Sequence, residues 1–174
     1  GHEICGVFPQ PDKPKNRGMK LQMPPVKEYA LSVGLPVFQP ARVRDGEALE
    51  ILKGLEPELI AVAAYGKILP LEILELPRLG CINVHSSLLP KYREDETGVT
   101  IMVMAEGMDT GDILSQRATP IPIEENAAQL FERLAQMGAE LLVETVAQIG
   151  AGAVTPVPQD ESGSSHAPML SREL

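Results

Sequence analysis

The hydrophobic positions of the chain alternate between short continuous runs and longer helical patterns. Continuous apolar runs of strand length occupy residues 4–8, 59–64 and 80–85. Apolar residues recur at helical spacing over residues 25–34, 46–54, 71–76 and 127–149. Strands that alternate with helices indicate an α/β fold, with a mostly parallel sheet covered by helices.

Two further strands are predicted at residues 98–104 and 113–119, where they flank a glycine-rich turn and form an antiparallel pair. The run 59–64 is apolar throughout, which predicts a central strand buried on both faces. Residues 35–40 predict a short edge strand, since prolines cannot donate to a sheet ladder. Asn126 is expected to cap the long helix that follows it.

The composition fits one globular domain. Of the 174 residues, 44% are hydrophobic, and no apolar run approaches the roughly 18 residues of a membrane span. The first residues lack a basic segment followed by an apolar one, so no secretory signal is expected. The two cysteines, Cys5 and Cys81, are too few for a disulfide framework or a closed zinc site. We therefore expect a cytoplasmic monomer with no membrane partner.

The acidic chain has one basic exception. Its net charge of −9 argues against general nucleic-acid binding, and its aromatic content of 3% argues against a base-stacking surface. Residues 12–27, however, carry five basic side chains against the single acid Asp12. Prolines bound this segment, which predicts an exposed loop that either binds an anionic partner or is simply solvated.

Asn83 and His85 end the apolar run 80–85, at the strand end where open α/β sheets place their sites. Residues two apart in a strand point to the same side, so an amide and an imidazole would share one small volume. This pair suits acyl chemistry, because a carboxamide donates to a developing oxyanion and a histidine moves protons near neutral pH. The alternative is a polar strand end that only caps the sheet.

Asp109 stands in the glycine-rich turn 107–112, from which its carboxylate could reach that imidazole. Turns of this composition are also common without any function. Glu94, Asp95 and Glu106 lie near strand ends as well. Spacing therefore leaves the choice among the four acids open.

Other kinds of site lack their motifs. Ser86 and Ser87 follow His85, but Gly-x-Ser-x-Gly is absent, and a base adjacent in sequence to a nucleophile usually points away from it. The sequence has no glycine-rich phosphate loop. Its histidines, which include His2 and His166, do not have the spacing of metal ligands.

Several segments together resemble the formyltransferase domain of the methionyl-tRNA formyltransferases. The central ones run from Cys81 to Arg93, from Glu96 to Met102 and from Gly107 to Leu114. Segments at 11–27, 64–70, 156–160 and 167–170 extend the resemblance over nearly the whole chain. It implies a doubly wound, Rossmann-like fold and transfer of a formyl group from 10-formyltetrahydrofolate to the methionine on initiator methionyl-tRNA.

The resemblance also implies residue roles, none of them involving a metal. Asn83 and protonated His85 would stabilise the oxyanion, while Asp109 would orient the histidine and help a water remove the amine proton. The implied folate-binding residues are Tyr65, Gly66, Lys67, Ile68, Leu69, Ser87, Leu88, Leu89, Pro90 and Asp112. The implied tRNA-binding residues are Lys13, Lys15, Arg17 and Lys20, which would contact phosphates.

Alternative functions stay open. The Asn-x-His and Leu-Leu-Pro segments are shared by other 10-formyltetrahydrofolate-dependent transferases and hydrolases, and a catalytically inactive α/β binding module is also compatible. The basic loop favours the tRNA enzyme, because the other acceptors require no basic insertion bounded by prolines.

The chain also departs from the family pattern. Compared with the family that it resembles, the sequence as given does not include the first strand and helix of the fold or the β-rich C-terminal domain, and Arg93 joins Glu94 where the family has a glycine-rich stretch. The sequence leaves open whether these segments are deleted or lie outside it. We expect residues 1–155 to form the catalytic domain, incomplete at its N-terminus and between Arg93 and Glu94. Residues 156–174 are expected to form a tail or the start of a linker.

Overall fold

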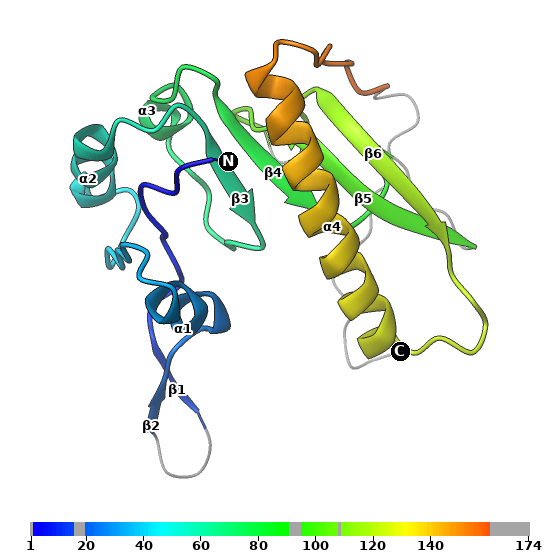
Figure 1. Cartoon of the computed structure of the whole chain (residues 1–174), viewed down its shortest axis with the longest axis horizontal. Helices are drawn as coiled ribbons and strands as arrows, with labels where there is room; N and C mark the ends of the chain where they lie inside the picture. Colours follow the sequence, from blue (N-terminus) through cyan, green and yellow to red (C-terminus); the bar gives the residue numbers. More distant parts are fainter. Residues whose placement is uncertain (1, 16–19, 91–94, 108, 161–174) are drawn as a thin grey trace. The chain divides into compact units, whose positions relative to one another are not determined.

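The chain folds into two compact units, each of which contains both helices and strands (Figure 1). The structure is a computed structural model that describes residues 2–15, 20–90, 95–107 and 109–160. The first unit comprises Gly1–Ile60 and Tyr65–Gly80, and the second comprises Ala61–Ala64 and Cys81–Leu174. This mixture of helices and strands confirms the predicted α/β class.

A four-stranded sheet forms the base of the second unit. Its strands lie in the order β3 (Ile60–Ala63), β4 (Cys81–His85), β5 (Glu96–Val103) and β6 (Ile113–Pro120). β4 is antiparallel to β5, and β5 is antiparallel to β6, so the predicted antiparallel pair is confirmed. The arrows of β3 and β4 point the same way in Figure 1, which makes the sheet mixed.

The strand buried on both faces is β5, in which five consecutive residues are buried. β3 is an outer strand of the described sheet, with Ala61 and Ala63 exposed and Ile60 and Val62 half-buried. The prediction of a central strand at 59–64 is therefore wrong. Alanine is tolerated at both exposed and buried positions, so an alanine-containing run is apolar in sequence even where one face is solvated.

Helix α4 (Ala127–Gly150) covers one face of this sheet (Figure 1). Its buried residues recur at helical spacing: Leu134, Gly138, Leu141 and Thr145. A Cβ atom at Gly138 would lie 3.0 Å from Val84 Cγ1 and 3.6 Å from Val99 Cγ1. The helix therefore packs closely against β4 and β5 at Gly138, because glycine has no side chain to keep them apart.

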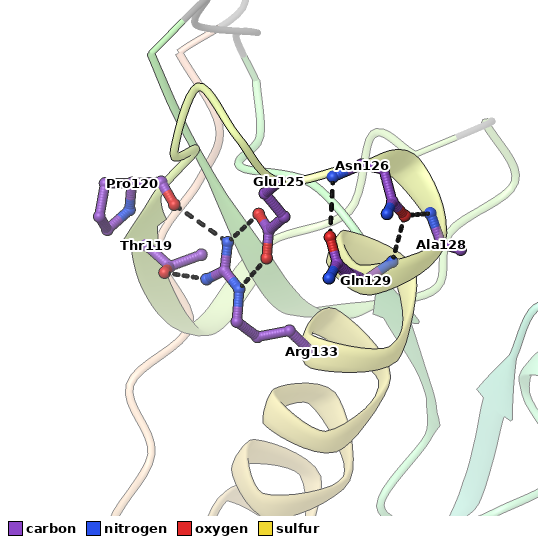
Figure 2. A network of polar contacts seen from close by, with 7 residues as sticks. All are labelled: Thr119, Pro120, Glu125, Asn126, Ala128, Gln129 and Arg133. Atoms are coloured by element: carbon purple, nitrogen blue, oxygen red, sulfur yellow. Dashed lines mark hydrogen bonds and ion pairs between the residues drawn. The ribbon is translucent and has the colours of Figure 1, made fainter.

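Asn126 caps α4, as predicted (Figure 2). Its side-chain oxygen accepts hydrogen bonds from the backbone N–H groups of Ala128 at 3.0 Å and Gln129 at 3.1 Å. The Gln129 side chain in turn accepts from the Asn126 backbone N–H at 3.1 Å. This reciprocal capping box satisfies backbone donors that the first helical turn cannot pair internally.

Arg133 joins the start of α4 to the end of β6 (Figure 2). Its guanidinium donates to both carboxylate oxygens of Glu125, at 2.8 Å and 2.6 Å. It also donates to the Thr119 hydroxyl and to the Pro120 carbonyl. The bidentate pairing lowers the pKa of the Glu125 carboxyl below its ordinary value.

The first unit contains three helices and a hairpin among its described residues. The helices are α1 (Pro25–Ser32), α2 (Glu47–Leu55) and α3 (Leu71–Leu74), at the predicted positions. The hairpin pairs β1 (Lys13–Lys15) with β2 (Lys20–Gln22) in an antiparallel register. Gly34, at φ +74°, follows α1 and ends the helical pattern there.

A single parallel bridge, between Val7 and Val37, takes the place of two predicted strands. Two backbone hydrogen bonds of 2.9 Å form it. The predictions of strands at 4–8 and 35–40 are therefore wrong in extent over the residues described. The second segment contains two prolines, whose missing N–H groups prevent the ladder from extending.

Candidate active site

Asn83 and His85 lie on the face of β4 that points away from α4. The register pairs Asn83 with Met102 and His85 with Thr100, while Val84, between them, points toward Gly138 of α4. Because side chains alternate along a strand, both polar groups occupy the opposite face. The predicted juxtaposition of an amide and an imidazole is therefore present.

Asp109 lies beside His85. The Nδ1 atom of His85 is 3.7 Å from Oδ1 of Asp109, and the two side chains are 23% and 37% exposed. This distance suits an ion pair with a protonated imidazole and is longer than a hydrogen bond. Asp95 and Glu106 are exposed, and Glu94 lies outside the described residues. Among the three of these acids that the structure describes, Asp109 is the one that lies beside His85.

The backbone of the turn that carries Asp109 is constrained. Asp109 has φ +53°, a left-handed conformation that costs a residue with a Cβ atom about 1–2 kcal/mol. A Cβ atom at Gly111 would lie 1.9 Å from the Val103 carbonyl oxygen, so this position needs glycine. The backbone carbonyl of Asp112, at the end of the same turn, accepts a hydrogen bond from the Val103 N–H at 2.9 Å.

Gln159, which the sequence pattern did not single out, reaches this turn from beyond α4. Its side-chain amide donates to the carbonyl oxygens of Asp109 and Gly111, both at 2.8 Å. The segment is aligned by Val157, which pairs with Ile113 through backbone hydrogen bonds of 2.8 Å and 2.9 Å. Part of the predicted tail therefore packs beside β6 and contacts the candidate site.

A hydroxyl in the centre of the sheet holds the loop 87–90. Thr100 Oγ1 donates to the Ser87 carbonyl at 2.7 Å and accepts from the Leu89 N–H at 3.3 Å and from Gln116 Nε2 at 2.9 Å. Gln116 also donates to the Leu89 carbonyl at 2.9 Å. Sequence reasoning missed both residues, although a polar residue inside the apolar run of β5 was a visible signal.

Close packing fixes the same loop from below. A Cβ atom at Gly98 would lie 2.7 Å from Leu88 Cδ2 and 2.1 Å from the Arg117 carbonyl oxygen. The Leu89–Pro90 peptide bond is cis. Ser87 is buried, and its hydroxyl has no hydrogen-bond partner among the described residues. Burial without a partner is costly, so this hydroxyl suits contact with a polar ligand.

The first unit carries the other predicted folate residues, Tyr65 to Leu69. Leu69 is buried and Ile68 is exposed. The Tyr65 carbonyl accepts a hydrogen bond from the Gln10 amide, and burial raises the pKa of the Tyr65 phenol. The Lys67 ammonium lies 5.7 Å from the centre of the Tyr65 ring and is buried, with no hydrogen-bond partner in the described part of the chain.

An ion pair defines the base of the basic hairpin. Lys27 Nζ lies 2.9 Å and 2.7 Å from the two carboxylate oxygens of Asp12, and Gln39 bonds to both residues. The hydrogen bond from Lys27 lowers the pKa of the Asp12 carboxyl. These two charges cancel, and the remaining basic residues of the segment are Lys13, Lys15, Arg17 and Lys20.

The register of the hairpin places Lys15 opposite Lys20 and Lys13 opposite Gln22. Lys13 is exposed, and Arg17 lies outside the described residues. In the described ranges, no cluster of three or more histidine, cysteine, aspartate or glutamate residues could hold a metal ion. Nor does that part of the chain contain a helix long and apolar enough to cross a membrane.

Comparisons with known proteins identify the family of the chain. A family model described as formyl transferase matches residues 1–146. The chain belongs to the formyl transferase family. The resemblance found in the sequence is therefore confirmed for the residues that surround Asn83, His85 and Asp109.

A curated relative, the methionyl-tRNA formyltransferase of Trichlorobacter lovleyi, is 49% identical over 182 residues. The match covers 98% of this chain and 58% of that relative. The chain thus spans about three fifths of the length of the curated relatives it matches.

Solved structures confirm the Rossmann-like formyltransferase fold. The formyltransferase PseJ from Anoxybacillus kamchatkensis, in complex with a formamido nucleotide sugar and tetrahydrofolate, has a TM-score of 0.64 at 25% identity. That match covers 92% of this chain and 85% of PseJ. A glycinamide ribonucleotide transformylase from Geobacillus kaustophilus has a TM-score of 0.58 at 32% identity, covering 67% of this chain and 72% of that one.

Proposed function

We propose that the protein transfers a formyl group from 10-formyltetrahydrofolate to the α-amino group of methionine on initiator methionyl-tRNA. The observation that carries this proposal is the position of Asn83 and His85 on one face of β4, with Asp109 3.7 Å from the imidazole. Membership of the formyl transferase family supports the reaction class, and the curated relative supports the acceptor.

The three side chains fit the steps of acyl transfer. The methionyl nitrogen attacks the formyl carbon, and the carbonyl electron pair moves to oxygen. The Asn83 amide and the protonated His85 imidazole donate to that oxyanion. Asp109 stabilises the imidazolium and, through a water, accepts the proton lost by the amine. When the carbonyl re-forms, the bond from carbon to N10 of the folate breaks, and N10 takes up the proton that the amine lost, returned from Asp109 through the water.

Two buried polar groups support a folate co-substrate. The Ser87 hydroxyl of the second unit and the Lys67 ammonium of the first each lack a hydrogen-bond partner among the described residues. A folate carries both amide-like polar atoms and carboxylates, which match a hydroxyl and an ammonium. We assign the ten residues implied by the resemblance to this ligand, with the Thr100 hydroxyl holding the loop 87–90 in place.

The basic hairpin supports a tRNA acceptor. Asp12 pairs with Lys27, and the four other basic residues of the segment give it a net positive charge that attracts phosphates. An acidic protein with one basic hairpin concentrates its attraction for a polyanion at that hairpin. A small sugar amine or ribonucleotide would not need this segment, although the solved relatives with such names keep those acceptors as the alternative.

The catalytic assignment is tested with His85→Ala and Asn83→Ala. We expect each to lower kcat about a hundredfold or more, as for a lost oxyanion donor, with little change in folate affinity. His2→Ala, which removes an exposed histidine of the other unit, is the matched control and should retain full activity. If His85→Ala turned over like the parent, the assignment would be refuted.

The acceptor is tested at the hairpin. Arg17 and Lys20 are replaced together by Ala, and methionyl-tRNA and folate are titrated separately at two salt concentrations. We expect unchanged folate binding and weaker tRNA binding, with a salt slope reduced by about 0.7–0.9 for each phosphate that is no longer neutralised. The control replaces Lys53 and Arg78, which form exposed ion pairs, by Ala. Equal tRNA affinity in all three proteins would exclude this role.

A further inference from the structure

The Gln159 side chain is connected to the candidate site through hydrogen bonds to two backbone carbonyl oxygens. Its amide nitrogen lies 2.8 Å from the Asp109 carbonyl oxygen and 2.8 Å from the Gly111 carbonyl oxygen. A primary amide has two N–H groups, so each carbonyl receives its own hydrogen bond. The side chain is half-buried and comes from a segment that Val157 holds against Ile113.

These contacts span the part of the turn that needs support. Asp109 adopts a left-handed conformation that residues with a Cβ atom avoid, and such conformations persist where the surroundings over-determine them. On the other flank, Gly111 packs directly against the Val103 carbonyl. The turn is therefore held by two kinds of contact: the hydrogen bonds from Gln159 to its carbonyl oxygens, and the close packing of Gly111 against Val103.

The backbone of this turn sets the position of the Asp109 carboxylate. At 3.7 Å from His85, a small rotation of the backbone would carry the carboxylate out of reach of the imidazole. We propose that Gln159 is a positioning residue for formyl transfer, which holds Asp109 in the conformation that faces His85. The inference rests on the proposed function, because it assigns Gln159 a role through Asp109 and none in contact with substrate.

The side-chain chemistry makes this inference specific. Glutamate has the same length and shape, but its carboxylate offers no donor at neutral pH and repels both carbonyl oxygens. Methionine is of similar length and carries neither donor nor charge. Both substitutions remove the two hydrogen bonds. They differ in charge and polarity, so an effect that both share is attributed to the lost hydrogen bonds.

The test compares Gln159→Glu and Gln159→Met with Gln148→Glu, which makes the same charge change at an exposed position of α4. We expect both Gln159 variants to lower kcat about tenfold, with KM for folate and for methionyl-tRNA within about twofold, as for a lost transition-state interaction. The control should match the parent. Thermal unfolding of all variants verifies the fold, and the methionine variant decides the outcome if the glutamate variant does not fold.

Coupling to Asp109 distinguishes this inference from the proposed function. In an Asp109→Asn background, we expect Gln159→Met to have no further effect on kcat, because the residue acts only through Asp109. Parent-like kcat in both Gln159 variants, or additive losses with Asp109→Asn, would overturn the inference and leave the proposed function standing. Parent-like kcat in Asp109→Asn itself would overturn the inference together with the catalytic role assigned to Asp109, whereas failure of the parent to transfer a formyl group would overturn the proposed function.

Discussion

Replacing Thr100 by Val tests whether the sheet positions the loop 87–90, to which we assign folate binding. Valine has nearly the same shape, so the change removes one hydroxyl without creating a cavity at a residue that is 0% exposed. Gln116 keeps its second bond to the Leu89 carbonyl, but the Ser87 carbonyl loses its donor at 2.7 Å. A buried acceptor left unpaired costs about 1–3 kcal/mol, which sets the expected loss in the free energy of unfolding.

Thr145→Val is the matched control. Thr145 is 1% exposed, donates to the Leu141 carbonyl at 2.7 Å and bonds to Ser115 at 2.6 Å, but lies on the opposite face of the sheet. Urea unfolding should register a loss in both variants. Only Thr100→Val should raise KM for 10-formyltetrahydrofolate, by about three- to tenfold if about 1 kcal/mol of loop order is lost. Equal KM values in the two variants would refute the reasoning.

Three further predictions concern individual residues. Burial raises the pKa of the Cys81 thiol to about 12, so at pH 8 a thiol reagent should modify Cys5 well before Cys81 in the native protein, and both at equal rates in denaturant. Arg133 lowers the pKa of Glu125 below its ordinary 4.5, so the pair stabilises the fold above pH 4.5 and loses this contribution as the pH falls further. Glu125→Gln should therefore make the free energy of unfolding depend less steeply on pH on the acid side. An unchanged dependence would contradict this. Gly111→Ala places a methyl group 1.9 Å from a carbonyl oxygen and should reduce formyl transfer at least tenfold, measured against the parent at equal folded fraction.

Local patterns were sufficient to predict most elements of the fold. Helical spacing, together with proline at the first turn and glycine after the last, located α1, and Asn126 located the start of α4. The order of the strands was harder to predict, because burial on two faces depends on which strands and helices lie beside a strand. An apolar run in the sequence does not identify those neighbours. The strand buried on both faces is β5. Its sequence contains Thr97 and Thr100, so it does not stand out as a continuous apolar run.

The candidate site divides in the same way. Asn83 and His85 could be predicted because their spacing along one strand fixes a shared face. Spacing alone did not choose Asp109 among the four acids; the family resemblance named it, and the turn places its carboxylate 3.7 Å from His85. Gln159 could not be predicted at all, because it acts through backbone carbonyl groups, and its type carries no signal of that contact.

The two hydrogen bonds of Gln159 also limit when the turn can be completed during synthesis of the chain. The amide reaches back 50 residues to the Asp109 carbonyl. During synthesis, a nascent chain that has already released β4 and its histidine still lacks the residue that closes the turn. The contact cannot exist before the segment that follows α4 has been synthesised and has paired with Ile113 of β6. Under the proposed roles, the contact that positions Asp109 can therefore form only after the chain has been synthesised through Gln159, 50 residues beyond the aspartate.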